Sequence, residues 1–253
     1  MTGNLLLRGM LAGLLAGVLA FGFAKVFGEP PVDQAIAFEE SMAHSHAHGD
    51  GAAEEEEELV SREVQGGLGL FTGIVAYSVA IGGLFALAFA FAMGRMGSLK
   101  IGPRGLAAIL ALLAFISVIL VPGLKYPANP PSVGDPETIR QRTKLFFLML
   151  VVSLAALVVA VNLFRKLLAR HGGWTAAVLA IVLYGVIMAV AGKLFPAINE
   201  VPEQFSATLL WQFRVVSLGI HVVLWTVLGL AFGWLAQGPV LAPRVKHDAR
   251  LRS

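Results

Sequence analysis

Long apolar stretches alternate with short polar segments along the chain. Six stretches approach the roughly 20 predominantly apolar residues that a helix needs to cross the hydrocarbon core of a bilayer. We predict spans over residues 5–27, 68–93, 106–121, 145–164, 174–194 and 215–235, of which the third is the shortest. The pattern therefore predicts an all-α integral membrane protein with about six transmembrane helices.

Composition supports this class. Of the 253 residues, 57% are hydrophobic and 14% are charged, against about 25% charged in a soluble domain. We expect a single transmembrane domain over residues 1–237, in which 28–67 is a His- and Glu-rich loop, followed by a basic tail over 238–253. The chain has no cysteine, which leaves imidazole, carboxylate, carbonyl and thioether groups as metal ligands. Its net charge of +3 is spread over several loops, so we expect no nucleic-acid partner.

Lysine and arginine are divided unequally between the two sets of connections. The termini and the even-numbered connections carry 11 of the 19 basic residues but only one acid, Asp248. The other three connections carry the remaining 8 basic residues and 15 of the 16 acids. Because basic residues favour the cytoplasmic side, we expect cytoplasmic termini and a periplasmic 28–67 loop, in a multi-pass protein of the bacterial inner membrane.

The first apolar stretch resembles a signal peptide in length, but its charged region is thin. Its small residues Gly9, Gly13 and Gly17 recur every four positions. This spacing lets two membrane helices approach closely. We therefore expect a retained span rather than a cleaved segment.

The ends of the odd-numbered spans share a pattern. A lysine is followed within two residues by an aromatic residue (Phe27, Tyr126 or Phe195), then by proline and acids. The even-numbered spans begin near a basic residue, and these are Arg62, Arg142 or Lys144, and Arg214. The pattern favours a helical hairpin used three times, as in many transporters. A lysine at the C-terminal end of a helix and a proline that stops it also explain an ordinary helix end.

Acids gather at these three helix ends. They are Glu29, Asp33, Glu39, Glu40, Asp135, Glu137, Glu200 and Glu203. The acids either pair with the nearby cations or create a negative potential that concentrates cations. The sequence leaves both interpretations open.

Histidines provide two candidate metal sites. His44, His46 and His48 precede a run of five glutamates, and imidazole suits cobalt, nickel, copper and zinc. The tract is either a weak metal-collecting loop or an acidic linker without a metal role. His221 is the one histidine inside the predicted spans. It is either a ligand or proton carrier, or it hydrogen-bonds a neighbouring helix.

Several enzyme classes are unsupported. The chain has no phosphate-cradling G-x-x-x-x-G-K-[ST] motif, no H-E-x-x-H and no nucleophile elbow. We therefore expect a protein that is not an enzyme and has no bound cofactor.

Three segments resemble the CbtA family of predicted cobalt transporter subunits. They are "LLLRGMLAGLLAGVLAFGFAKVFGEPPVDQAIAFEE", "LVPGLKYPANPPSVGDPETIRQRT" and "INEVPEQFSATLLWQFRVVSLG". The resemblance extends from about Leu5 to Gln237 and implies five or six spans, cobalt uptake and a small His-containing partner, CbtB. The resemblance also implies a set of motif positions at the outer mouth, the periplasmic end of the spans where a cation would enter. They are Glu29, Asp33, Glu39, Glu40, Lys125, Tyr126, Pro127, Asn129, Asp135, Asn199, Glu200, Glu203 and Arg214. His221 and the histidine triplet match no family motif.

The sequence leaves two functions open. The first is a membrane subunit that admits Co²⁺, or alternatively Ni²⁺, from the periplasm as the transported substrate. The second is a non-transporting scaffold that docks a small His-rich partner. A polar path leading inward from Asn129 and Asn199 would favour transport, and a dry, leucine-packed bundle would favour the scaffold. A homo-oligomer is compatible with either.

Overall fold

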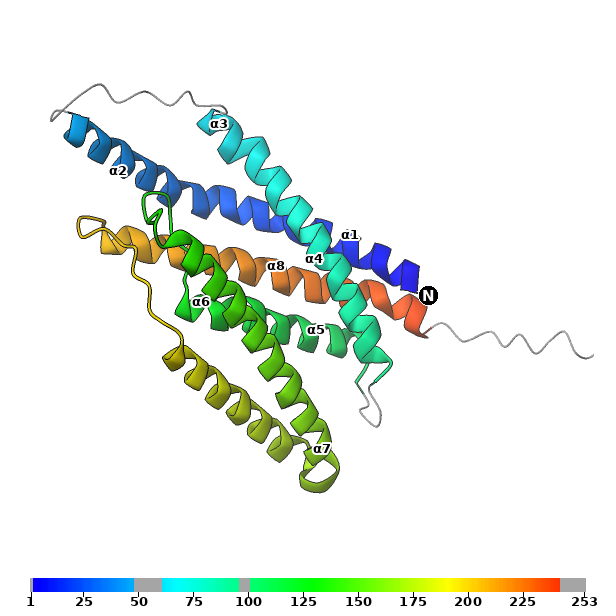
Figure 1. Cartoon of the computed structure of the whole chain (residues 1–253). Helices are drawn as coiled ribbons and strands as arrows, with labels where there is room; N and C mark the ends of the chain where they lie inside the picture. Colours follow the sequence, from blue (N-terminus) through cyan, green and yellow to red (C-terminus); the bar gives the residue numbers. More distant parts are fainter. Residues whose placement is uncertain (1, 48–60, 96–100, 242–253) are drawn as a thin grey trace, which may run out of the picture. The chain divides into compact units, whose positions relative to one another are not determined.

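The computed structural model describes residues 2–47, 61–95 and 101–241 (Figure 1). These residues form helices and connecting turns, with no strand among them. In chain order the helices are α1 (Thr2–Phe23), η1 (Ala24–Gly28), α2 (Glu29–Ala47), α3 (Arg62–Val64), η2 (Gln65–Gly69), α4 (Leu70–Met93), α5 (Pro103–Ala114), η3 (Phe115–Leu120), α6 (Val121–Lys125), α7 (Ile139–Leu194) and α8 (Ala207–Leu241). Among these described residues, five stretches of helix are long and apolar enough to cross a membrane. The predicted all-α membrane class is confirmed.

The first helix extends far beyond the span predicted to end at Phe27. Gly3–Met42 is one stretch of 40 residues, about 60 Å long at about 1.5 Å per residue. A bilayer core is about 30 Å thick, so about half of this helix extends past it. The description of residues 28–67 as a loop is therefore wrong for Glu29–Ala47 and for the helix that begins at Arg62.

A π-helical turn explains why the prolines do not end this helix. Proline inside an α-helix lacks the N–H that bonds residue i−4, and its ring meets that carbonyl. Here Pro30 follows η1, in which the Glu29 N–H bonds the Ala24 carbonyl five residues earlier. The wider turn changes the carbonyl spacing just before the proline. Pro122 likewise comes two residues after the end of a π-helical turn, η3. It lies within the continuous helical stretch Pro103–Lys125.

The other two predicted helix ends are confirmed. The stretch Pro103–Lys125 ends at Tyr126, whose φ of −127° and ψ of 78° are not helical. α7 ends at Leu194, and Phe195 is extended. A proline follows the aromatic residue in both cases, where it restricts the residue before it to extended backbone.

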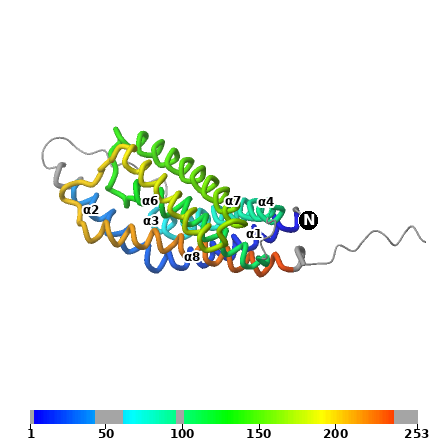
Figure 2. Tube along the Cα trace, turned by 90° about the horizontal axis from the view of Figure 1, so that it is seen from below, coloured from blue at the N-terminus to red at the C-terminus, as the bar shows by residue number. Residues whose placement is uncertain are grey.

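α7 contains both the fourth and the fifth predicted spans. It covers 56 residues, but Gly172 interrupts it with φ 75° and ψ 167°, a conformation that is essentially confined to glycine. The chain reverses direction near this residue, so that α7 consists of two arms (Figure 1). The tube of Figure 2 shows the same reversal from a second direction.

The contacts divide the chain into two compact units. Unit 1 comprises Met1–Leu19, Thr72–Leu112 and Leu224–Ser253. Its packing confirms the small-residue seam predicted in the first span, because a β-carbon added at Gly9 or Gly13 would overlap the backbone of Gly82 or Ser78. Aromatic rings fill another part of unit 1, where Phe89 and Phe232 lie with centroids 5.0 Å apart.

Unit 2 comprises Ala20–Phe71 and Leu113–Val223. Its two α7 arms pack together through Met149 and Ala156 on one arm and Met188 and Ala191 on the other. Inside this packing, the Ser153 hydroxyl donates to the Ser117 carbonyl at 2.7 Å. Ser117 lies in η3, so a side chain bonds a carbonyl at a point where the helix departs from α-helical pairing.

Candidate functional site

Unit 2 contains a polar cluster built around Glu200. We call Asn129, Thr138, Arg142, Glu200 and Arg214 the second ion-pair cluster. The Glu200 side chain is 2% exposed. Its carboxylate accepts a hydrogen bond from the Thr138 hydroxyl at 2.8 Å and lies 3.5 Å from Nε of Arg142. The Asn129 amide donates to the same carboxylate at 3.4 Å. A buried carboxylate is thus both paired and hydrogen-bonded, as burial of a charge requires.

Two arginines hold the segment that follows α6. Nη2 of Arg142 donates to the Pro127 carbonyl. Arg214 donates through Nε to the Ala128 carbonyl at 3.2 Å and through Nη2 to the Asn129 side-chain oxygen at 3.0 Å. This proline-rich segment has few backbone N–H groups and no helical partner, so side chains from α7 and α8 satisfy its carbonyls.

Tyr126 anchors the beginning of the same segment. Its ring is buried against the α7 arms, and its hydroxyl donates to the Pro196 carbonyl at 2.8 Å. Burial raises the pKa of the Tyr126 hydroxyl above its ordinary value. The hydroxyl therefore remains a protonated donor at neutral pH, and the two proline-containing helix ends stay connected.

A second group of charges lies where the first helix meets Arg62. We call Lys25, Glu29, Asp33 and Arg62 the first ion-pair cluster. Nη2 of Arg62 lies 3.0 Å from the Glu29 carboxylate and 2.9 Å from that of Asp33. Nζ of Lys25 lies 3.8 Å from Glu29 and donates to the Gly66 carbonyl at 2.9 Å. Because two acids face two cations, this cluster is electrically neutral.

The remaining motif residues are not gathered at a common point. Glu39, Glu40, Asn199 and Glu203 are exposed. Asp135 accepts from the Glu137 backbone N–H and Asn199 from the Val201 backbone N–H, both as local turn contacts. Lys125 is half-buried at the end of α6. The sequence groups these positions by motif, and the structure distributes them over α2, the end of α6 and separate turns.

The histidine triplet lies at the edge of the described chain. The backbone of His44 and His46 belongs to α2, and His48 lies outside the described residues. Across residues 2–47, 61–95 and 101–241, no group of three or more His, Asp or Glu side chains is placed to hold a metal ion. The triplet therefore stays a prediction.

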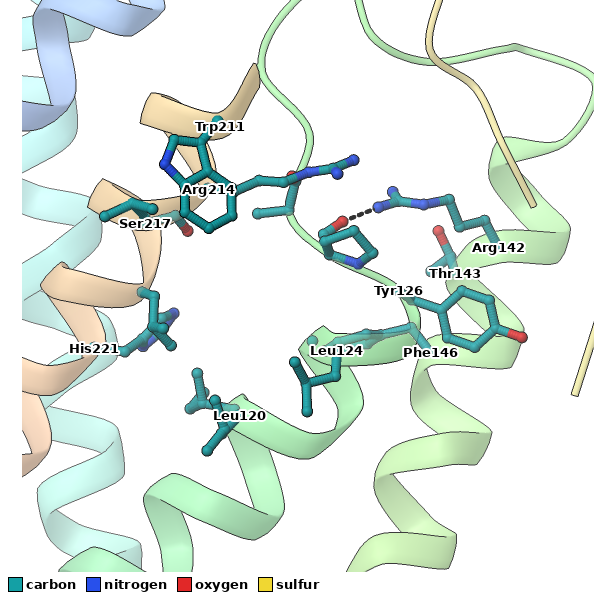
Figure 3. A pocket seen from close by; sticks show the side chains of 16 residues that line it. Leu120, Leu124, Tyr126, Arg142, Thr143, Phe146, Trp211, Arg214, Ser217 and His221 are labelled. Carbon is teal, nitrogen blue, oxygen red and sulfur yellow. Dashed lines mark hydrogen bonds between the residues drawn. The ribbon is translucent and has the colours of Figure 1, made fainter. Parts of the chain in front are cut away.

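A pocket opens between α6, α7 and α8 within unit 2 (Figure 3). Its volume is about 680 Å³. Arg142 and Arg214 lie at one end, and His221 and Leu120 lie at the other. Most of the remaining wall is apolar, with Leu124 and Phe146 among its side chains. In the described part of the chain, the buried Nδ1 of His221 has no hydrogen-bond partner. The pocket thus joins the second ion-pair cluster to an unpartnered imidazole.

Sequence reasoning did not identify two partners of the motif acids. The pattern of basic residues marks Arg142 only as one of the cations near the start of an even-numbered span, and it gives no reason to single out Thr138. The signal that could have found Arg142 is its position four residues after Thr138 at the start of a helix, where both side chains reach the same point.

The comparisons with known proteins give one result on family. A family model described as "Probable cobalt transporter subunit (CbtA)" matches residues 2–237. Neither the search of curated proteins nor the search of solved structures found a match. Together with five helices able to span a membrane, the family match describes a multi-pass membrane protein with a role in transport. The chain belongs to the CbtA family of probable cobalt transporter subunits.

Proposed function

We propose that this chain is the membrane subunit through which a bacterial transporter takes up Co²⁺, with Ni²⁺ as an alternative substrate. It lies in the inner membrane with both termini in the cytoplasm and admits the cation from the periplasm. The unequal distribution of Lys and Arg supports this orientation. The Gly172 reversal supports six crossings, because each arm of α7 then crosses separately. The role is not enzymatic.

His221 in the pocket carries the transport proposal for this chain. Its buried Nδ1 lacks a hydrogen-bond partner among the described residues, and a buried polar atom without a partner is costly. Neutral imidazole nitrogen is a suitable ligand for cobalt and nickel. Ser217, one helical turn before His221, also lines the pocket and adds an oxygen donor. For a cation in the pocket to use these atoms in place of part of its hydration shell, the imidazole must turn and bring Nδ1 to the pocket surface.

The membrane potential is sufficient to drive such uptake without a nucleotide. It contributes about 2.3 kcal/mol per charge per 100 mV, and therefore about 4.6 kcal/mol for a divalent cation. At about 1.36 kcal/mol per decade, this corresponds to an accumulation of about a thousandfold. The chain needs to supply a selective route rather than a source of energy.

The motif acids favour a second candidate function, a non-transporting scaffold that docks a small His-rich partner such as CbtB. Glu29 and Asp33 are paired with Arg62, and Glu200 is paired with Arg142. Carboxylates engaged in this way stabilise the helix ends and are poor ligands for a passing cation. If the motifs act only through such contacts, the geometry that they hold would serve assembly with a partner subunit.

Uptake in proteoliposomes separates the two functions. Radiolabelled Co²⁺ uptake is measured at a set potential, with and without the partner subunit, for the unmodified chain, His221→Ala and His171→Ala. His171 is an exposed histidine beside the Gly172 reversal and does not line the pocket, so it is the matched control. We expect His221→Ala to lower uptake at least tenfold and His171→Ala to leave it unchanged. Absence of uptake by the unmodified chain in both conditions would leave the scaffold as its function.

A further inference from the structure

The arginine end of the pocket has a chemistry that a cation substrate does not explain. Arg142 and Arg214 both line it, and a divalent cation there would meet two positive charges. The buried Glu200 offsets one of them. The second ion-pair cluster therefore has a net charge of +1, which is suited to a singly charged anion.

Both guanidinium groups retain hydrogen-bonding capacity. Each has five N–H donors. Arg142 uses Nε for Glu200 and Nη2 for the Pro127 carbonyl, and Arg214 uses Nε for the Ala128 carbonyl and Nη2 for Asn129. In the described part of the chain, Nη1 of each arginine is without a partner. Fixed arginines with free donors at the wall of a pocket match the geometry that phosphate oxygens require.

The rest of the pocket identifies the kind of anion. Leu120 and Leu124 lie beneath the arginines (Figure 3), and Leu218 adds to the apolar lining of the pocket. Leu124 is 76% exposed and Trp211, beside Arg214, is 69% exposed, so these side chains contact lipid in a membrane protein. Tryptophan is enriched at the boundary between head groups and acyl chains. A free phosphate ion would use the arginines but gain nothing from this wall.

We propose that the pocket binds an anionic phospholipid, with its head-group phosphate at Arg142 and Arg214 and an acyl chain along Leu120 and Leu124. A volume of about 680 Å³ lies within the usual range of about 300–1,000 Å³ for ligand sites. The lipid head group occupies the arginine end, about two helical turns from His221. Binding is a property of the metal-free protein and does not depend on the proposed transport of cobalt.

Lipid binding to the purified, metal-free chain in detergent tests the proposal. Native mass spectrometry measures the affinities of phosphatidylglycerol, phosphatidylcholine and inorganic phosphate. We expect phosphatidylglycerol to bind about tenfold more tightly than phosphatidylcholine, and inorganic phosphate at equal concentration not to displace it. Arg214→Gln should weaken phosphatidylglycerol binding about fivefold, which corresponds to about 1 kcal/mol for one basic residue.

Two further variants distinguish the site from a general attraction of lipid to positive charge. Arg140→Gln removes an exposed charge two residues from Arg142 and should leave the affinity unchanged. Glu200→Gln raises the net charge of the cluster to +2 and should strengthen phosphatidylglycerol binding about fivefold. Equal affinity for the two lipids, an equal loss in Arg140→Gln and Arg214→Gln, or displacement by inorganic phosphate would each overturn the proposal.

Discussion

Arg214 provides a direct test of where a cation binds in the pocket. Arg214 and His221 lie seven residues apart on α8, which is about two turns and about 10 Å along one face of the helix. The Arg142 charge is offset by Glu200, whereas Arg214 bonds only neutral oxygens. Arg214 is therefore the main positive charge that opposes a divalent cation at His221, and Arg214→Gln should strengthen cobalt binding.

The size of the effect follows from Coulomb's law. A charge of +2 about 10 Å from a charge of +1 experiences a repulsion of about 3.3 kcal/mol at an effective dielectric constant of about 20. Arg214 is partly exposed, and the screening length is about 10 Å at 0.1 M salt, so about 1 kcal/mol is the lower bound. The corresponding gain in Co²⁺ affinity is about fivefold to about 250-fold.

The assay is the Co²⁺ concentration at half-maximal uptake, measured in proteoliposomes of phosphatidylcholine so that no anionic lipid offsets the arginine. Arg214→Lys keeps the charge but loses the guanidinium geometry, and we expect it to resemble the unmodified chain. Arg214→Gln should lower the half-maximal concentration at least fivefold, and the gain should shrink in high salt. An unchanged or higher value in Arg214→Gln, with thermal stability retained, would refute a cation site at His221.

Four further predictions concern stability and uptake. Glu200→Ala removes the carboxylate that pairs with Arg142 and should lower the free energy of unfolding in detergent by about 3 kcal/mol. Glu203→Ala, at an exposed position, is the control and should change the free energy of unfolding by less than about 0.5 kcal/mol. Gly13→Val overlaps the Ser78 backbone and should cost about 1–3 kcal/mol by the same measurement; an unchanged melting temperature would contradict the close packing. Gly172→Ala should cost about 1–3 kcal/mol because of its φ of 75°, and Gly173→Ala is its control. Deleting residues 43–58 should raise the half-maximal Co²⁺ concentration without abolishing uptake, and complete loss of uptake would show that the segment is essential.

The helices could be predicted from the sequence because the apolar stretches are long. Four of the six predicted segments lie within separate helices, and the other two lie within α7 on either side of Gly172. The end of the first helix could not be predicted from the sequence. At Pro30 and at Pro127 alike, the proline follows a lysine and an aromatic residue. Only the first of the two follows a π-helical turn, and hydrophobic periodicity does not reveal such a turn.

The site could be predicted only in part. The sequence identified Asn129, Glu200 and Arg214 as motif residues, and they do lie in one cluster. It did not identify their pairing, because the partners are separated by 71 and 85 residues and their contact depends on how α7 and α8 meet the segment after α6. Local patterns give the positions of such groups along the chain but not the register between helices.

The sequence left open whether the acids pair with nearby cations or create a negative potential that concentrates cations. For the acids that are paired, the structure decides between these two interpretations. Within the first ion-pair cluster, Lys25 and Arg62 offset Glu29 and Asp33, and the second cluster has a net positive charge. Neither cluster can therefore produce a negative potential at the helix ends. Any attraction of cations must come from acids outside the clusters, such as the exposed Glu39 and Glu40 on α2 and the run of five glutamates that follows the histidine triplet in the sequence. The first helix is longer than the bilayer core is thick and carries Glu39 and Glu40 on its distal half. Under the proposed function, cation collection and cation passage would therefore involve different parts of the chain.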